Sequence, residues 1–289
     1  MRCFAWLSAC ALASGLSASA QTGVVKYTEP TQKAFTALVP AGWKVSGGIT
    51  HWGPDVAGAL NATEAKVEWT VQSDAAGTIR GNWLPDVQFI DMTNSPAGGM
   101  FPPGSQCNGC VSLPRMSVPD YLVQVVMPRL CPQARNLRVV SQSRVPEAEQ
   151  ALDKLRALLG VTLPLVYRAD LVAVEYTEGA TKYRQLMFAA TEDNIKLGVG
   201  LWKSRSTIVF RAPVAKFAAA VSTLQRVQNS IKVNHEWLAA EMKAAEERTG
   251  VVAGTYKRIR ELDADIVRNR QATNEAINRQ MQKLLTKVD

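Results

Sequence analysis

The sequence predicts an α+β fold: an antiparallel β-sheet with several helices, followed by a long C-terminal helix. Three observations support this prediction. Short segments of alternating apolar and polar residues are joined by turns rich in Gly, Asn and Asp, which is typical of antiparallel hairpins. Other segments carry apolar residues at helical spacing. The segment 234–289 contains no proline and is rich in Ala, Glu, Lys, Arg and Gln, a composition that favours helix.

The first twenty residues resemble a secretory signal peptide. Arg2 precedes an apolar run from Phe4 to Leu16, and Ala18-Ser19-Ala20 fits a cleavage site after Ala20. The run is too short to span a bilayer, so a membrane anchor is not expected. Cys10 could be a lipidated residue instead, but cleavage there would leave too short an apolar segment. We expect an exported protein, periplasmic or extracellular, that is not an integral membrane protein.

Composition indicates a globular chain. With 289 residues, 47% of them hydrophobic, it can bury a substantial core in one large domain or two modest ones. The formal net charge is +8, but the Lys and Arg residues are dispersed and interleaved with acids, which is typical of a solvated basic surface. No basic stripe with stacking aromatic residues is present in the sequence, so nucleic-acid binding is not expected.

The first strands are predicted after a short polar lead. Residues 34–48, AFTALVPAGWKVSGG, predict a strand, a tight turn and a second strand paired as a hairpin, because Pro40 fixes φ and Gly42 can take a positive φ. Ile49 to Trp52 continues the second strand. Alternation predicts further strands, each with one covered and one polar face, at Lys66–Gln72 and at Thr78–Ile90, with a break at Pro85.

A Gly- and Pro-rich segment from Asn94 to Pro119 predicts a long irregular loop, either a binding loop or an insertion. It carries a C-x-x-C pair, Cys107 and Cys110, and Cys131 follows it. In an exported protein we expect one disulfide, either between Cys107 and Cys110 or from one of them to Cys131, and one free thiol. The surrounding Gly and Pro disfavour a redox pair, and ligands are too few for zinc. No metal or cofactor is expected.

The second half of the chain predicts two helices and a second set of strands. Helical spacing marks 118–130, which begins with Pro119 and Asp120, and a charged run over 147–159. Turns at Glu178-Gly179 and at 192–194 separate strands typical of hairpins. The expected strands are 137–145, 165–177, 182–191, 196–203 and 207–211, and a helix follows from Phe217 to about Ser230.

Three stretches of the sequence match the pattern of one family of domains. In the run AFTALVPAGWKV, Phe35, Pro40, Gly42 and Trp43 match the family's opening, an apolar strand followed by P-x-G-W. A late strand, IVFRAP, leads into the helix FAAAVSTLQRVQNSIKV, where Ser230-Ile231 stands in place of the family's usual Ser-Phe ending. With these motifs, the chain resembles the PsbP/Mog1-like domains.

This resemblance covers roughly Val25 to Asn234. It implies α-β-α layers, in which helices flank an antiparallel sheet, and a non-catalytic role in binding or assembly. The loop at 94–119 and the charged helix at 147–159 look like additions to the family pattern. A fold of this kind hosts different partners, so the resemblance names no ligand.

The sequence carries few of the residues and motifs that are typical of catalytic sites. It holds two histidines and lacks the G-x-S-x-G, H-E-x-x-H and phosphate-binding glycine motifs. His51 is the candidate base, although a histidine at a strand end is typical of a structural hydrogen bond. Trp52 and Trp83 lie beside breaks in the strands, so we expect them to be exposed for an apolar, peptide or glycan ligand. The candidate ligand-binding residues are His51, Trp52 and Trp83, and no catalytic residue is assigned.

The segment 234–289 predicts a long helix, with a bend or break at Gly250 and Gly254. A single helix with an uncovered apolar stripe is marginally stable, so we expect self-association, a coiled coil or a protein partner to cover it; a frayed tail is the alternative. Polar Asn269 and Thr273 interrupt the stripe. The stripe consists of Ile259, Leu262, Ile266, Ile277, Met281, Leu284 and Val288.

The sequence therefore predicts a signal peptide at 1–20, a PsbP/Mog1-like body at 21–233 with its insertion at 94–119, and a helical extension at 234–289. The expected function is that of an exported, non-enzymatic binding or assembly module that uses the extension as an interaction helix. One alternative is an envelope hydrolase with a hidden site near His51. The other is a purely structural coiled-coil interaction protein.

Overall fold

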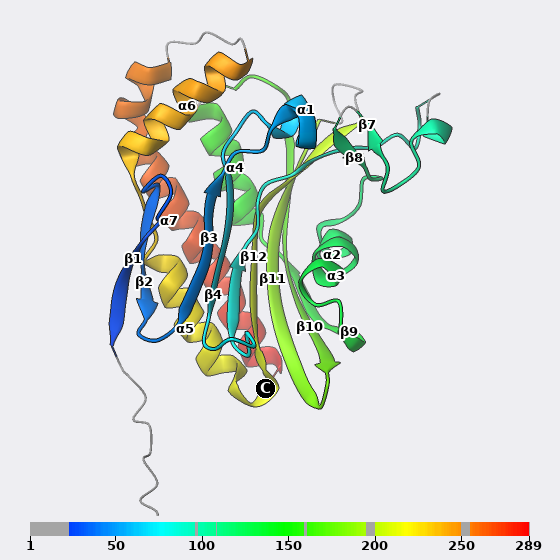
Figure 1. Cartoon of the computed structure of the whole chain (residues 1–289), viewed down its shortest axis with the longest axis vertical. Helices are drawn as coiled ribbons and strands as arrows, with labels where there is room; N and C mark the ends of the chain where they lie inside the picture. Colours follow the sequence, from blue (N-terminus) through cyan, green and yellow to red (C-terminus); the bar gives the residue numbers. More distant parts are fainter. Residues whose placement is uncertain are drawn as a thin grey trace, which may run out of the picture.

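A computed structural model describes residues 23–95, 98–107, 109–158, 161–194, 200–249 and 255–288. The predicted signal peptide lies outside the described residues. The fold is α+β, as predicted, and helices lie on both sides of a large sheet (Figure 1). None of the described helices is both long enough and apolar enough to cross a membrane.

The strands form a ten-stranded sheet and a three-stranded sheet. The large sheet has the spatial order β3-β4-β5-β12-β11-β10-β9, and β6, β7 and β8 attach beside β12. The small sheet has the order β1-β2-β13. The neighbouring strands are antiparallel, apart from β6 and β8, which are parallel. The bounds are β1 Val24–Thr28, β2 Phe35–Pro40, β3 Lys44–Thr50, β4 Lys66–Gln72, β5 Arg80–Trp83, β6 Gln88–Ile90, β7 Gln106–Cys107, β8 Cys110–Ser112, β9 Arg135–Arg144, β10 Val166–Glu178, β11 Thr181–Asp193, β12 Leu201–Pro213 and β13 Lys232–Val233.

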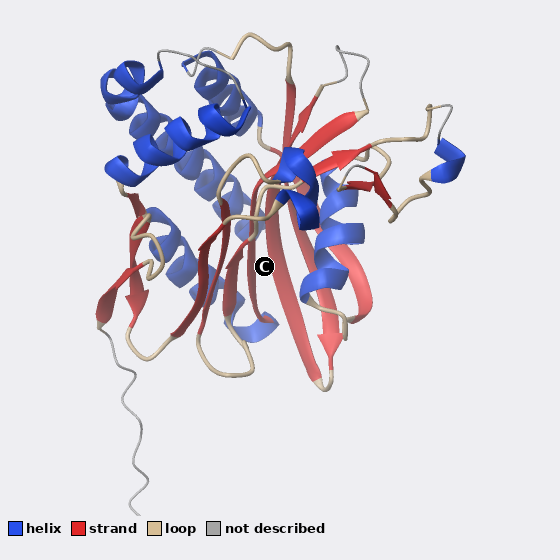
Figure 2. Cartoon of the chain, turned by 45° about the horizontal axis from the view of Figure 1, so that its top comes forward, coloured by secondary structure: helices blue, strands red, loops and turns tan. Residues whose placement is uncertain are grey.

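Helices cover the large sheet unequally (Figure 2). Helices α4, α5 and α7 pack on one face, where α4 contacts β10, α5 contacts β12 and α7 contacts β9 and β10. The other face carries α2, η2 and α3, which form one continuous helical segment over 118–130 with a π-helical middle. The bounds are α1 Pro54–Asn61, η1 Gly98–Met100, α2 Val118–Tyr121, η2 Leu122–Val126, α3 Met127–Leu130, α4 Pro146–Leu158, η4 Val214–Lys216, α5 Phe217–Asn229, α6 His235–Thr249 and α7 Thr255–Val288.

Two apolar cores lie on the two faces of the central strands. Leu186 and Phe188 of β11 belong to the core under α4, α5 and α7, whereas Met187 between them belongs to the core under the 118–130 helix. Successive side chains of a strand point to opposite faces, so strands that are apolar at consecutive positions need cover on both sides. The layered arrangement follows from this requirement.

The predicted hairpin at 34–48 is wrong in its pairing, although both strands and the turn are present. Trp43 N–H donates to the Pro40 carbonyl at 3.1 Å, and Gly42 has a φ of 82°. Strand β2 pairs with β1 and β13, whereas β3 pairs with β4. The turn therefore carries the chain from the small sheet to the large one, because β2 already has partners on both sides.

The two strands predicted at 196–203 and 207–211 are one strand, β12, over its described residues. Opposite Phe188 and Ala190 the register of β12 shifts by one residue, which is a β-bulge. Ser206 lies at this bulge with a φ of 52°, and its N–H donates to Asp86 Oδ1 at 2.8 Å. A bulge keeps a strand continuous where the sequence pattern changes, so the pattern alone indicates a break.

Helix α7 packs into the body instead of projecting from it. Ile277, Met281 and Leu284 are buried in the same core as α5 and the central strands, so the expectation that these side chains await a partner is wrong. The polar Asn269 in the stripe is also buried, and its Nδ2 donates to the Ala151 carbonyl of α4 at 2.6 Å. The side chains of Ile259, Leu262, Ile266 and Val288 lie outside the described part of the structure.

This packing predicts that Met281→Ala destabilises the protein. The side chain is 1% exposed, so its truncation leaves a cavity between α7 and α5 that should cost about 2–5 kcal/mol of unfolding free energy. Urea denaturation of the purified protein measures the change. Lys283→Ala, two residues further along α7 and exposed, is the control and should change the free energy of unfolding by less than about 0.5 kcal/mol. Equal urea midpoints for the two variants would contradict the packing of α7 against the body.

Candidate functional site

A network of charged side chains lies where β4 begins, near the end of the large sheet drawn uppermost in Figure 1. Glu64 is its centre, with Oε1 3.3 Å from Lys66 Nζ and in contact with Lys203 Nζ, and Oε2 3.7 Å from Arg205 Nη1. Arg205 also pairs with Asp86 at 3.2 Å and with Glu192 at 2.8 Å. Three carboxylates thus meet three cations, and the network joins β4, β11, β12 and the segment between β5 and β6.

The pKa values in the network follow from burial and pairing. Burial raises the pKa of Glu64, but Lys203, Arg205 and Lys66 outweigh it and lower that pKa to about 2. Burial lowers the pKa of Lys66 and Lys203 adds to this effect, whereas Glu64 opposes it. Because the charges balance, each buried cation has its carboxylate and the network leaves no unpaired charge for a ligand.

His51 and Trp52 lie at the same end of the sheet, beside this network. His51 Nε2 is 2.9 Å from Glu241 Oε2 of α6, and His51 Nδ1 is 3.3 Å from Gln32 Nε2. Glu241 Oε1 in turn accepts a hydrogen bond from Ala65 N–H at 3.1 Å. Trp52 is half-buried, and Lys66 Nζ lies 5.3 Å from its ring centroid. Both ring nitrogens of His51 are engaged, so this histidine attaches α6 to the end of β3.

Trp83 is in the core, and the prediction that it is exposed is wrong. It is 8% exposed, its ring centroid is 4.4 Å from that of Trp69, and its Nε1–H donates to Gln228 Oε1 of α5. Strand β5 lies between β4 and β12, so its apolar side chains on the α5 face are covered. The structure therefore brings His51 and Trp52 together but separates Trp83 from them.

The three described cysteines are buried and unpaired, so the predicted disulfide is wrong. Cys107 and Cys110 are partners across the β7–β8 hairpin. Cys131 follows α3, with its Sγ 3.1 Å from Tyr176 Oη and 3.8 Å from Arg211 Nη1, so β10 and β12 hold it away from that hairpin (Figure 1). Among the described residues, no group of three or more His, Cys, Asp or Glu side chains could hold a metal ion.

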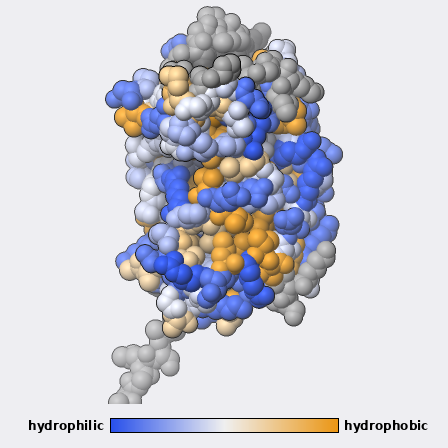
Figure 3. Space-filling model, turned by 90° about the vertical axis from the view of Figure 1, so that its right-hand side faces the viewer, coloured by the Kyte–Doolittle hydropathy of each residue, from blue (hydrophilic) through white to orange (hydrophobic). Residues whose placement is uncertain are grey.

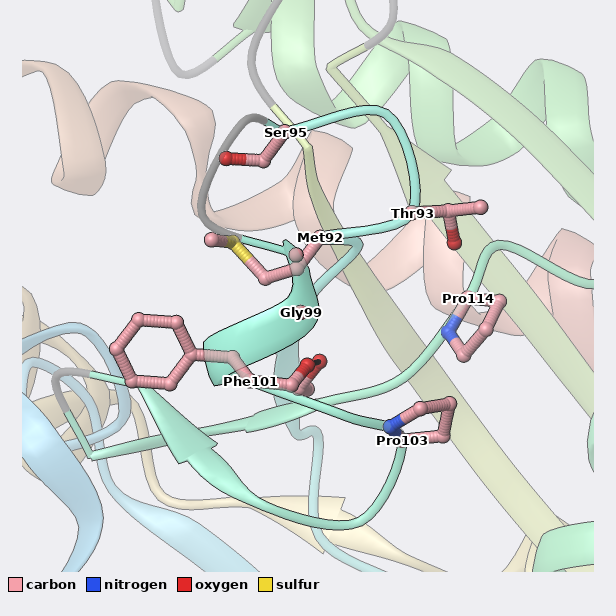
Figure 4. A pocket seen from close by; sticks show the side chains of 9 residues that line it. Met92, Thr93, Ser95, Gly99, Phe101, Pro103 and Pro114 are labelled. Atoms are coloured by element: carbon pink, nitrogen blue, oxygen red, sulfur yellow. Dashed lines mark hydrogen bonds between the residues drawn. The ribbon is translucent and has the colours of Figure 1, made fainter.

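The Gly- and Pro-rich insertion, together with Met92 and Thr93 before it, lines an open hollow of about 310 Å³ (Figure 4). Its lining carries no charged side chain. The hydroxyl group of Ser112 is used within the protein, since its Oγ–H donates to the Phe101 carbonyl at 2.9 Å. The lining residues are Met92, Thr93, Ser95, Gly98, Gly99, Phe101, Pro103, Ser112 and Pro114.

An apolar face lies over β9 and the 118–130 helix (Figure 3). Leu137 and Val139 of β9 are 39% and 49% exposed, and half-buried Val123 and Leu130 pack against the core beneath them. Val139 stands opposite Val174 of β10, which places Leu137 and Val139 on the face that the helix covers only in part. In the described part of the chain, β9 pairs with β10 alone, so it is an edge strand.

Sequence reasoning missed this face. The alternation over 137–145 indicated a strand, but alternation is the same for an edge strand and for a covered one. The available signal was the charge of the strand: Arg135, Arg138 and Arg144 are typical of the edges by which sheets avoid pairing with each other.

Comparisons with known proteins name no family for this chain. No protein-family model matches it, and a search of curated proteins finds no match. Among solved structures, cyanobacterial PsbP (CyanoP) from Synechocystis aligns with 79% of this chain and 99% of its own, at 11% sequence identity and a TM-score of 0.31. The structural likeness to PsbP is therefore weak, and no conclusion about function rests on it.

The charged network predicts that Glu64→Gln destabilises the protein at neutral pH. The change leaves Lys66 and Lys203 without their carboxylate, which should cost about 3 kcal/mol. The folded pKa of Glu64 is below its unfolded value, so its contribution is complete above about pH 4.5 and is lost as pH falls toward 2. Urea denaturation should therefore show a difference in unfolding free energy between the variant and the parent protein. This difference should be smaller at acidic pH than at neutral pH.

Glu68→Gln is the matched control for this experiment. Glu68 lies four residues further along the chain, in β4, and pairs with Arg129, but both side chains are about half exposed, so its loss should cost less than about 1 kcal/mol. The network would be described wrongly if Glu64→Gln lost no more unfolding free energy than Glu68→Gln, or if its loss became larger at acidic pH.

Proposed function

We propose that the protein is an exported, non-enzymatic binding or assembly module that contacts a protein partner through the apolar face of β9 and the 118–130 helix. The observation that carries this proposal is the exposure of Leu137 and Val139 on an edge strand, beside a helix that leaves that side of the sheet partly uncovered. Apolar side chains gathered at one place on a surface are typical of protein-interaction sites.

Covering the exposed parts of Leu137 and Val139 should contribute on the order of 1–2 kcal/mol, which is typical of the central contacts of an interface. The polar residues around them can form the rim of such an interface. An interface with these side chains at its centre would be completed by a partner of matching shape.

Export is proposed from the sequence of the first twenty residues. Their charged start, apolar run and small-residue cleavage site are typical of a secretory signal. A periplasmic or extracellular location also fits a binding or assembly role in the cell envelope.

The other interpretations draw less support. A hydrolase near His51 would need a free ring nitrogen on this base, whereas both nitrogens face Glu241 and Gln32. A coiled coil through α7 would need its apolar stripe, whereas Ile277, Met281 and Leu284 are buried against the body. Partner binding is therefore assigned to the β9 face instead of the C-terminal helix.

The proposal is tested by site-specific photo-cross-linking in the cells that make the protein. With p-benzoylphenylalanine in place of Val139, ultraviolet light should give a protein adduct, because this side chain would lie inside the interface. The same replacement of Leu38 on β2, which is 46% exposed, should give no such adduct. An absence of adducts at position 139, or equal adducts at both positions, would refute the proposed binding face.

A further inference from the structure

The β9 edge combines its apolar residues with an excess of positive charge. Arg138 and Arg144 are more than half exposed. Arg135 is exposed as well, and its guanidinium donates to the neighbouring Ala134 carbonyl at 3.2 Å. Within the described residues no carboxylate lies within ion-pair distance of Arg135.

Each carboxylate paired along β9 is shared by several cations. Glu175 of β10 accepts from Arg138 at 2.6 Å, from Lys182 at 2.8 Å and from Arg184 at 2.8 Å. Burial raises the pKa of Glu175, but hydrogen bonds from Lys182, Arg138 and Arg184 outweigh it and lower that pKa to about 2, so the carboxylate is charged at neutral pH.

The other end of β9 repeats this arrangement. Glu149 of α4 lies 2.6 Å from Arg144 and 3.9 Å from Arg168, and Asp170 stands opposite Arg144 in the register. Strand β9 itself carries three arginines, Arg135, Arg138 and Arg144, and no acidic residue. Of these, Arg135 and Arg138 lie next to Leu137 and Val139 along the strand.

A second copy of this chain fits the edge poorly. If two β9 strands paired antiparallel about their middle, Arg135 of each would lie opposite Arg144 of the other, and like charges directly opposite are destabilising.

We infer that the partner of this face presents carboxylates beside apolar side chains, so that acidic groups meet Arg135 and Arg138 while apolar groups cover Leu137 and Val139. This inference rests on the proposed function and specifies the chemistry of the partner. Successive side chains of β9 point to opposite faces, so a segment lying along this edge meets apolar groups on one side and guanidinium groups on the other. An extended segment of alternating acidic and apolar residues has the matching pattern.

The test uses the purified protein with p-benzoylphenylalanine at position 139 and two short synthetic peptides of equal length as probes. One alternates Val and Glu, and the other alternates Val and Lys. Mass spectrometry of the irradiated mixtures should show several-fold more adduct with the Val–Glu peptide. Raising the salt concentration should reduce this preference, because the charges involved are exposed.

Variants of the same protein test whether the β9 edge causes the preference for the Val–Glu peptide. Arg135→Glu should remove most of the preference for the Val–Glu peptide, and Arg135→Lys should retain it, because the positive charge remains. Lys26→Glu on β1 is the matched control, since Lys26 is exposed and its substitution changes the net charge by the same amount. It should leave the preference unchanged.

The possible outcomes separate this inference from the proposed function. Equal adduct with both peptides, or an equal loss of preference in Arg135→Glu and Lys26→Glu, would overturn the acidic partner even if cross-links form at position 139 in cells. An adduct in cells of twice the mass of the protein, made of two copies of this chain, would also overturn it. An absence of cross-links in cells would instead refute the proposed function itself.

Discussion

The need to cover both faces of the central strands shapes the rest of this structure. From Tyr183 to Glu192, every residue of β11 is buried, and its apolar side chains divide between two cores. Helices α4, α5 and α7 supply a broad cover on one face. On the other face, the helical cover among the described residues is the short segment over 118–130, which leaves part of β9 exposed. The exposed apolar residues of β9 are a consequence of this unequal cover.

The small sheet is attached to the large one by a buried carboxylate. Glu29 follows β1 and accepts hydrogen bonds from the backbone N–H groups of Thr31 and Gln32 in the following turn, and from Ile49 of β3 at 3.2 Å. Burial raises the pKa of Glu29, but these backbone hydrogen bonds outweigh it and lower that pKa. A Cβ at position 48 would lie 2.5 Å from Glu29 Oε1, so a larger residue there would have to displace this carboxylate.

Charge is distributed differently at the two places where charged side chains gather. Around Glu64, acids and bases are equal in number and Lys66 and Lys203 are buried, so their interactions are satisfied within the protein. Along β9 the cations outnumber the acids and Arg135 and Arg138 remain exposed. In a balanced, buried network each charge already has its partner, so the loss of one partner is costly, whereas an unbalanced, exposed group of charges can still gain from a charged partner. This contrast directs functional interpretation to β9 and away from His51.

The amino-acid sequence alone determined the elements whose signals are local. Strand β4 coincides with the predicted Lys66–Gln72, and helix α4 lies within one residue of its predicted bounds, because alternation and helical spacing depend on near neighbours. The α+β class follows from such elements and could be predicted.

Only the tertiary structure decided which elements meet. It separated β2 from β3, buried Trp83 beneath α5, and placed Ile277, Met281 and Leu284 of α7 in the core instead of on a free surface. The sequence pattern of an amphipathic helix is the same whether a partner or the body covers it. The edge position of β9 likewise depends on strand order, which is a property of the whole chain. Local periodicity indicates that a segment has an apolar face that must be covered. The long-range packing of the chain determines which element covers it.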